Sequence, residues 1–188
     1  MKITKNDVIA TASALADKDG LNSVSLKVVA EQLGIRTPSL YNHIESLEQL
    51  LLEVAHQGMK EMNEDMMQAA IGISGTPAIQ AISIAYLSYM IAHPGVYETI
   101  QWATWHGTSE TDEIFHTYLN LITTLIRSCG YQENDIPAIR DCITGMLHGF
   151  TTLQLRFALT EPEKVKKQLH CAIESLLTGT EHTYLNIS

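Results

Sequence analysis

The sequence predicts an all-α protein of about nine helices, in which a small N-terminal domain over residues 1–46 precedes a larger helical body over residues 47–188. Apolar residues recur at helical spacing along almost the whole chain. Alternating strand patterns bounded by hairpin turns are missing. The clearest break, GISGTP at residues 72–77, combines glycine with proline and is typical of a connection between elements.

Composition and charge narrow the choice of partners. The chain has 188 residues, 45% of them hydrophobic, which is enough to bury a substantial core. Its net charge of −9 argues against indiscriminate binding to nucleic acid or to anionic membranes. The first fifty residues nevertheless carry five Lys/Arg against six Asp/Glu, so that most of the negative charge lies further on. A polyanionic partner is therefore expected to meet the N-terminal part.

Cysteine usage and the apolar segments predict a soluble, cytoplasmic protein. The three cysteines are widely spaced and form no CxxC pair, so a disulfide framework or zinc knuckle is not expected. Aspartates at positions 7, 17 and 19 interrupt the N-terminus, which rules against a signal peptide. The most apolar stretch, AIQAISIAYLSYMIA, is shorter than the roughly 20 residues that a membrane span needs.

The first two helices are delimited by caps and stops. One apolar stripe runs from Lys5 to Lys18, and Gly20 ends it. Ser25 is suited to cap a second helix, for which Gly34 supplies the C-terminal stop. The inward-facing residues are Val8, Ile9, Ala12, Leu15 and Ala16 in the first helix and Leu26, Val29, Ala30 and Leu33 in the second.

The third segment, Thr37 to Ile44, has only Leu40 and Ile44 to offer to a core. Thr37 is the natural N-cap and Pro38 the natural first helical residue, because the N–H that proline lacks would have no partner there. A rotation of about 100° per residue, with the two apolar residues inward, turns the polar residues outward. The outward set is Pro38, Ser39 and Asn42, with Tyr41 and His43 on opposite flanks.

A tight turn, Gly34-Ile35-Arg36, joins the second and third segments and predicts a helix-turn-helix, whose second helix enters the major groove. Ser39 and Asn42 are suited to base edges, and Thr37 and Pro38 to a thymine methyl group. The flanking Tyr41 and His43 would reach phosphates. The alternative is an ordinary amphipathic helix in a bundle, with Tyr41 half-buried.

The segment SLKVVAEQLGIRTPSLYNHIESLEQLL, after a first helix, resembles the DNA-binding domain of TetR-type transcriptional regulators. The likeness covers roughly residues 5–55, and its most specific element is Leu40-Tyr41-x-His43 after the Gly34 turn. It implies groove-facing and backbone-contacting roles within the third segment, and Lys27 as a further DNA contact. The full predicted DNA-binding set is Lys27, Arg36, Thr37, Pro38, Ser39, Tyr41, Asn42 and His43.

One departure from the family pattern concerns the start of the fourth helix, where Leu47 stands in place of a common lysine. A probable phosphate contact is thereby removed. Together with a charge near zero in this domain, the substitution predicts modest nonspecific affinity and a shallow salt dependence.

The body begins with a long helix that Ser46 caps and that runs toward Ile71, followed by helices at about 77–92, 94–106, 110–129, 134–159 and 161–178. The last two carry apolar stripes, which predict a four-helix homodimer interface, with Gly145 and Gly149 allowing close approach. The alternative is that both stripes pack inside one subunit. The stripes are Ile139, Ile143, Met146, Leu147, Phe150, Leu153 and Phe157, and Val165, Leu169, Ala172, Ile173 and Leu176.

Aromatic residues with polar tips are concentrated between Tyr86 and Tyr118 and suggest a small-molecule site, although such residues also form plain cores. The run Trp105-His106-Gly107 is similar to a signature of one TetR subgroup. The resemblance implies a dimeric repressor that binds a palindromic operator and is released by an effector. The predicted ligand residues are Met62, Met66, Tyr86, Tyr89, Met90, Trp102, Trp105, His106 and Tyr118.

Other classes of function have weaker support. An enzyme is not expected, because catalytic motifs such as GxSxG, HExxH and a Walker loop are missing, and no catalytic residue or cofactor is predicted. Glu113-x-x-His116 is half of a di-iron motif whose second half is missing, so no metal is predicted. A helical dimeric adaptor that does not read DNA sequence is the remaining alternative.

Overall fold

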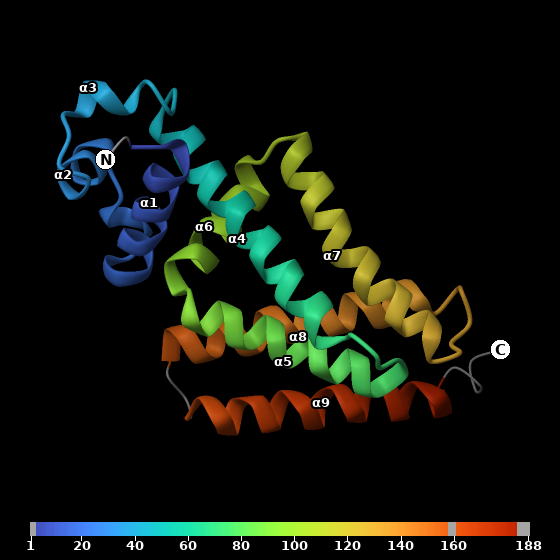
Figure 1. Ribbon diagram of the computed structural model, residues 1–188. Coiled ribbons are helices and arrows are strands. Elements are labelled where there is room, and N and C mark those ends of the chain that lie inside the picture. The colour runs from blue at the N-terminus through green and yellow to red at the C-terminus, as the bar shows by residue number, and fades with distance from the viewer. Residues whose placement is uncertain (1–2, 158–160, 184–188) are drawn as a thin grey trace. The chain divides into compact units, whose positions relative to one another are not determined.

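The computed structural model describes residues 3–157 and 161–183, and within them it contains nine α-helices, one short 3-10 helix and no strand (Figure 1). The all-α prediction is confirmed. The elements are α1 (Lys5–Asp19), η1 (Leu21–Ser23), α2 (Leu26–Gln32), α3 (Thr37–Leu40), α4 (Leu47–Ala69), α5 (Gly75–Ala92), α6 (Pro94–His106), α7 (Ser109–Ser128), α8 (Ile136–Phe157) and α9 (Pro162–Thr183).

Most helix starts follow from local sequence. The Thr4 side chain accepts a hydrogen bond from Asp7 N–H while the Asp7 carboxylate accepts one from Thr4 N–H, which is a complete capping box for α1. Ser25 caps α2, as predicted, through Val28 N–H at 3.3 Å. Ser46 caps α4 through Gln49 N–H at 3.0 Å. The helix predicted at 134–159 begins at Ile136, and residues 158 and 159 lie outside the described part of the chain.

The chain forms two compact units. The first contains the described residues up to Glu61 together with Ala92–Phe115, and the second contains Met62–Ile91 with the described residues from His116 onward. Two helices, α4 and α7, therefore contribute several residues to each unit, and α5 belongs to the second unit except for its last residue, Ala92. The predicted boundary at residue 46 divides the chain by function, and it stays a prediction.

In the first unit, α1 is the central helix. It packs against α6 and α2, and it buries the predicted stripe except for Leu15, which is partly exposed; Val8 and Ala12 are completely enclosed. The residues of α6 that share this core include Val96, Ile100 and Ala103. The N-terminal helices are thus held by α6, which lies some 80 residues away in the sequence.

In the second unit, α8 and α9 lie side by side (Figure 1). The stripe of α9 is internal, because Val165, Leu169 and Ile173 are all buried. The stripe of α8 is divided: Ile139, Ile143 and Leu147 are buried, whereas Leu153 is 45% exposed and Phe157 is 65% exposed. Within the described residues, no helix combines the length and the apolar character that crossing a membrane requires.

Candidate nucleic-acid interface and ligand site

The reading segment, residues 36–43, is anchored by two core side chains and exposes the rest. Leu40 is completely buried and Ile44 is 2% exposed, as the sequence predicts. Tyr41 is 58% exposed. The other accessible side chains are those of Arg36, Pro38 and Asn42, which are exposed, and those of Thr37, Ser39 and His43, which are partly exposed.

The α3 helix itself is shorter than predicted. Its regular part is the single turn Thr37–Leu40, its N-cap is Arg36 rather than Thr37, and Pro38 is its second residue rather than its first. Beyond Leu40 the chain continues in tight turns, with bonds from Asn42 N–H to Ser39 O at 3.4 Å and from His43 N–H to Leu40 O at 2.8 Å. Serine and asparagine favour turns over regular helix, which accounts for the early end.

The turn before α3 is a complete Schellman motif. Gly34 has a φ of 68°, which an L side chain rarely adopts. Ile35 N–H donates to Ala30 O at 3.0 Å and Gly34 N–H donates to Glu31 O at 3.1 Å. Two backbone hydrogen bonds therefore fix the turn between α2 and the reading segment.

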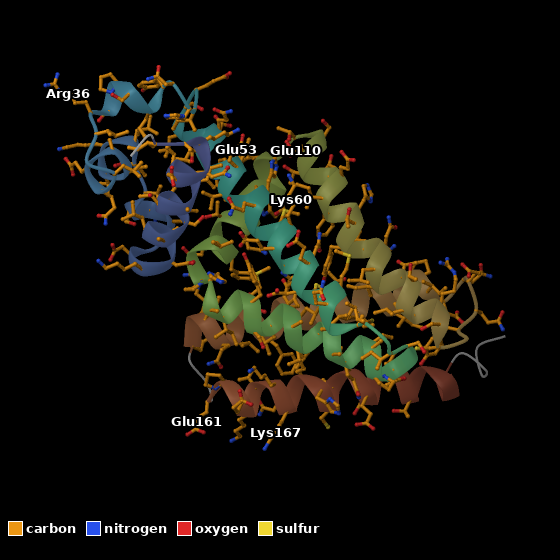
Figure 2. The ribbon with its side chains drawn as sticks, in the orientation of Figure 1. Arg36, Glu53, Lys60, Glu110, Glu161 and Lys167 are labelled. Atoms are coloured by element: carbon orange, nitrogen blue, oxygen red, sulfur yellow. The ribbon has the colours of Figure 1, made fainter. Side chains whose placement is uncertain are left out.

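The charged residues around the reading segment are few. The Arg36 side chain points away from the ribbon (Figure 2). Lys27 is exposed and lies 3.9 Å from Glu31 one turn on, while Lys5 forms an ion pair with Glu53 of α4. Leu47, at the start of α4, brings no charge.

A carboxylate that sequence reasoning missed connects α1 to α6. Asp17 Oδ1 accepts hydrogen bonds from the backbone N–H groups of Gly95 at 2.8 Å and Val96 at 3.0 Å, and its Oδ2 lies 2.9 Å from His93 Nδ1. Backbone N–H groups in the first turn of a helix have no acceptor within that helix. Because the N-cap residue of α6 provides no side-chain acceptor, Asp17 of α1 takes this role. Gly95 also touches the α1 backbone: a Cβ there would lie 2.0 Å from Ala16 C. The Pro94-Gly95 pair indicated a helix start in the sequence, but no spacing in the sequence connects that start with Asp17.

A second polar contact in the first unit involves the first turn of α7. The buried His56 of α4 lies with its Nε2 2.8 Å from Thr111 Oγ1 and its Nδ1 3.5 Å from Glu110 Oε2, and Lys60 reaches Glu110 at 3.2 Å (Figure 2). Burial lowers the pKa of His56, against the opposing effect of Glu110. The imidazole is accordingly neutral at neutral pH.

The Trp-His-Gly run lies at the surface of the first unit. Gly107 has no room for a side chain, because a Cβ would lie 2.5 Å from Ala103 O. Trp102 is partly exposed and stacks on His106 at 4.8 Å between ring centroids, whereas Trp105 is 86% exposed. The two tryptophans thus differ in exposure, and their assignment to a ligand site stays a prediction.

The predicted ligand residues fall into different units, so neither unit gathers all nine. Trp102, Trp105 and His106 belong to the first. The second contains the others, all buried to at least nine-tenths: Met62, Met66, Tyr86, Tyr89, Met90 and Tyr118.

Within the second unit, polar groups from three helices meet in what we call the tyrosine–histidine cluster: Tyr86 of α5, Tyr118 of α7, and Thr144 and His148 of α8. The Tyr86 ring lies 6.0 Å from that of Tyr118 and 5.8 Å from that of His148, and its hydroxyl is 3.3 Å from His148 Nδ1. Burial raises the pKa of Tyr118 to about 12, and a hydrogen bond with Thr144 acts in the opposite direction. Burial also lowers the pKa of His148. Thr144 and His148 were not among the predicted ligand residues.

One surface groove is lined neither by the reading segment nor by the predicted ligand residues. It has a volume of about 650 Å³ and runs along α1 and the end of α2. No group of three or more potential metal ligands occurs among the residues that the structure describes.

The anchored reading segment, the Schellman turn and the preceding helices together define a helix-turn-helix DNA-binding protein followed by a helical body. The family model described as "Tetracyclin repressor-like, C-terminal domain" matches residues 79–176, more than half of the chain. The chain therefore belongs to the TetR family and is a DNA-binding transcriptional regulator, and members of this family are not enzymes. Membership of the Trp-His-Gly subgroup stays a prediction.

Similar proteins agree with this assignment. The chain is 29% identical to YobS of Bacillus subtilis (strain 168), an uncharacterized HTH-type transcriptional regulator, over 94% of this chain and 92% of that protein. It is 26% identical to DrrR1 of Streptomyces coeruleorubidus, an HTH-type transcriptional repressor, over 94% of this chain and 66% of that protein.

Solved structures share the fold. A protein of unknown function from Rhodococcus sp. RHA1 superposes with a TM-score of 0.80 at 19% identity, covering 95% of this chain and 96% of that one. A TetR variant from Acinetobacter baumannii AYE, in complex with minocycline, superposes with a TM-score of 0.72 at 19% identity over the whole of both chains.

Proposed function

We propose that the chain is a repressor that binds a palindromic operator as a homodimer and leaves it when a small-molecule effector binds. The observation that carries this proposal is the reading segment, which exposes Tyr41 and Asn42 while Leu40 and Ile44 fix it to the core. Relatives support the direction of regulation, since DrrR1 is named a repressor. TetR-family regulators bind operators and small-molecule effectors and act as dimers.

In this proposal residues 1–46 read the operator. Asn42 pairs with an adenine edge, and Ser39 donates to or accepts from a neighbouring base. Thr37 and Pro38 contact a thymine methyl group. The residues that hold the phosphates are Lys27, Arg36, Tyr41 and His43.

The outward face of α8 favours dimerisation. Its exposed residues include Cys142, Gly145 and Gly149, and a Cβ added to either glycine would meet open space. Leu153 and Phe157 extend this face with exposed apolar surface. Small residues beside exposed apolar ones allow two helices to approach closely, so α8 and the adjoining α9 would meet their copies in a four-helix interface. The two reading segments would then contact half-sites about 34–36 Å apart.

The effector site is proposed in the second unit, at the tyrosine–histidine cluster, with Met62, Met66, Tyr89 and Met90 as further lining. Thioether side chains adapt easily to a ligand. The effector changes operator affinity only by as much as its affinity differs between the DNA-binding and the released arrangement of the chain.

Selection of bound fragments from a random DNA library tests the core of this proposal. A palindromic site is expected to emerge at physiological salt, and the Asn42→Ala variant is expected to lose it. Glu48→Ala, an exposed change nearby, serves as the control. Sedimentation of the chain with the selected site should give two chains per duplex.

The adaptor alternative is favoured by the acidic charge and by Leu47. It predicts that no discrete site emerges from the selection, while the chain still sediments as a dimer. That combination would contradict the repressor assignment.

A further inference from the structure

The surface groove of the first unit has one side of α1 as its floor, which we call the α1 seam. The residues of the seam follow the spacing i, i+3, i+4, i+7, i+8 and i+11, which places them along one side of the helix. Ala10 and Ala14 are exposed, and Leu15 is partly exposed. Short side chains at this spacing let a second helix approach closely. The seam consists of Asp7, Ala10, Thr11, Ala14, Leu15 and Lys18.

The two charged residues of the seam lie at its opposite ends. Asp7 and Lys18 are separated by three helical turns, about 16 Å along the axis. Hydrogen bonds with Thr4 lower the pKa of the Asp7 carboxyl group, so it is ionised at neutral pH. Lys18 is exposed and has no ion-pair partner among the described residues. The groove therefore offers one anion and one cation at a fixed separation.

This order of residues is self-complementary when two copies of α1 pair in antiparallel orientation about a twofold axis. With the axis between Ala12 and Ser13, each residue faces the one that lies equally far beyond the axis in the other copy. Opposite charges then meet at both ends, and short side chains meet apolar ones between them, whereas a parallel pair would bring like charges together. The facing pairs are Asp7 with Lys18, Ala10 with Leu15, and Thr11 with Ala14, each formed twice.

We propose that the groove binds the same groove of a second copy of this chain, so that two DNA-bound dimers contact each other through their α1 helices. This inference rests on the proposed dimeric repressor and adds a second kind of contact between copies. The contact is separate from α8 and α9, because all residues that line the groove belong to the first unit. His43 of the reading segment is close enough to lower the pKa of Asp7, so one end of the groove lies near the predicted DNA surface.

A contact of this size acts mainly on DNA. A single pair of short helices buries little surface compared with the roughly 1,200–2,000 Å² of stable interfaces, so the contact is weak between free dimers. Two operators on one duplex raise the effective concentration of neighbouring dimers to about the millimolar range. Binding of one dimer then favours binding of the next without any change in how either reads its own operator.

The test titrates the full-length chain onto duplexes that carry one or two copies of the selected operator, with spacings that cover one DNA turn. At one phase of this series the second dimer is expected to bind roughly 10-fold more tightly than a dimer binds a single operator. Ala14→Glu is expected to abolish this coupling, because it lengthens a side chain near the axis and adds a carboxylate one turn from Lys18. Asn6→Glu is the matched control, since it adds the same charge at an exposed position of α1 outside the groove.

Charge variants test how the two ends face each other. Lys18→Glu is expected to abolish the coupling and Lys18→Arg to keep it. Lys18→Glu combined with Asp7→Lys is expected to restore it with the signs reversed. The melting temperature of each variant is measured alongside, because Asp7 also belongs to the capping box of α1. Without DNA, sedimentation at about 1 mM is expected to show species larger than the dimer, which Ala14→Glu removes.

Three results would overturn the inference: no coupling at any spacing, coupling that Ala14→Glu leaves unchanged, or a loss of single-operator binding with Ala14→Glu that Asn6→Glu does not show. The last result would assign the groove to DNA. Normal binding of one dimer to one operator beside the first or second result would leave the repressor proposal standing. If the selection gives no discrete operator, sedimentation decides, and the absence of species larger than the dimer overturns the inference.

Discussion

In the first unit a carboxylate of one helix bonds directly to the backbone at the start of another. In the second unit the interior is mainly apolar, and bonds such as Gly75 N–H to Ser128 Oγ at 2.9 Å and the Tyr131 hydroxyl to Leu177 O at 2.7 Å join its segments. Asp17 makes two such bonds to the start of α6, and the Schellman turn at Gly34 makes two more. In the second unit, Ser83 and Thr151 bond only within their own helices. Directional bonds hold a reading surface in one geometry, while non-directional packing can rearrange around a guest.

A matched pair of core truncations is the strongest way to test this contrast. Leu40 in the reading segment and Leu87 in α5 are both completely buried. Leu40→Ala and Leu87→Ala are each expected to lower the free energy of unfolding by about 2–5 kcal/mol. Well below the melting temperature only Leu40→Ala should abolish operator binding, as measured by gel shift. Equal loss of operator binding in the two variants would contradict the contrast.

Removal of the Asp17 carboxylate breaks the hydrogen bonds that join α1 to the start of α6. Asp17→Ala leaves two α6 N–H groups without their acceptor and is expected to cost roughly 1–3 kcal/mol of unfolding free energy. Ser83→Ala, which removes a bond within one helix, should cost much less. Chemical denaturation of both variants measures the difference. Similar costs would mean that the Asp17 contact adds little to what packing already provides.

Within the reading segment, the comparison is between a base-reading and a phosphate-binding side chain. Asn42→Ala is expected to lose about 1–3 kcal/mol of binding to the selected operator and to relax the preference at one base pair. Tyr41→Phe should weaken selected and random DNA alike. If Asn42→Ala weakened binding to selected and random DNA equally, Asn42 would not be a base-reading residue.

Each unit contains one histidine that is expected to make its stability depend on pH: the buried His56 in the first and the partly buried His148 in the second. Burial lowers the pKa of both, so the unfolded chain binds protons that the folded chain does not. Their contribution to stability is complete above the ordinary pKa of 6.5 and is lost as the pH falls from there through the folded-state pKa. His56→Gln and His148→Gln should each flatten the curve of stability against pH in this range. An unchanged slope in either variant would exclude that histidine as a source.

The smallest effect is expected at Leu47. Leu47→Lys restores a cation near the predicted phosphates, and the slope of log affinity against log salt should steepen by about 0.9. Leu47→Gln controls for the lost apolar side chain. A slope that stays the same would place this residue away from the DNA backbone.

Much of this fold was predictable because its signals are local. The caps at Ser25 and Ser46, the stop at Gly34 and the burial of Leu40 and Ile44 depend on neighbours within a few residues. The extent of α3 was overestimated, because periodicity does not show where a run of serine and asparagine changes from helix to turns.

Contacts between distant segments could not be derived in this way. Asp17 was recognised only as a charge that interrupts an apolar N-terminus, since nothing in its surroundings indicates Gly95 and Val96 as partners. The aromatic residues between Tyr86 and Tyr118 were treated as one group because they are close in sequence. The chain places Trp105 at the surface of one unit and Tyr86 in the interior of the other, and it adds His148 from a remote helix.

The position of Trp102 and Trp105 on α6 has a practical consequence for spectroscopy. They are the only two tryptophans in the chain, and both belong to the first unit. Emission excited at the red edge of the indole band therefore reports on the unit that carries the reading segment and is blind to the other. Tyrosine emission comes from both units, because Tyr41 and Tyr97 belong to the first and Tyr86 and Tyr118 to the second, so the tryptophan signal is the one that assigns a spectral change to a single unit of the unmodified protein.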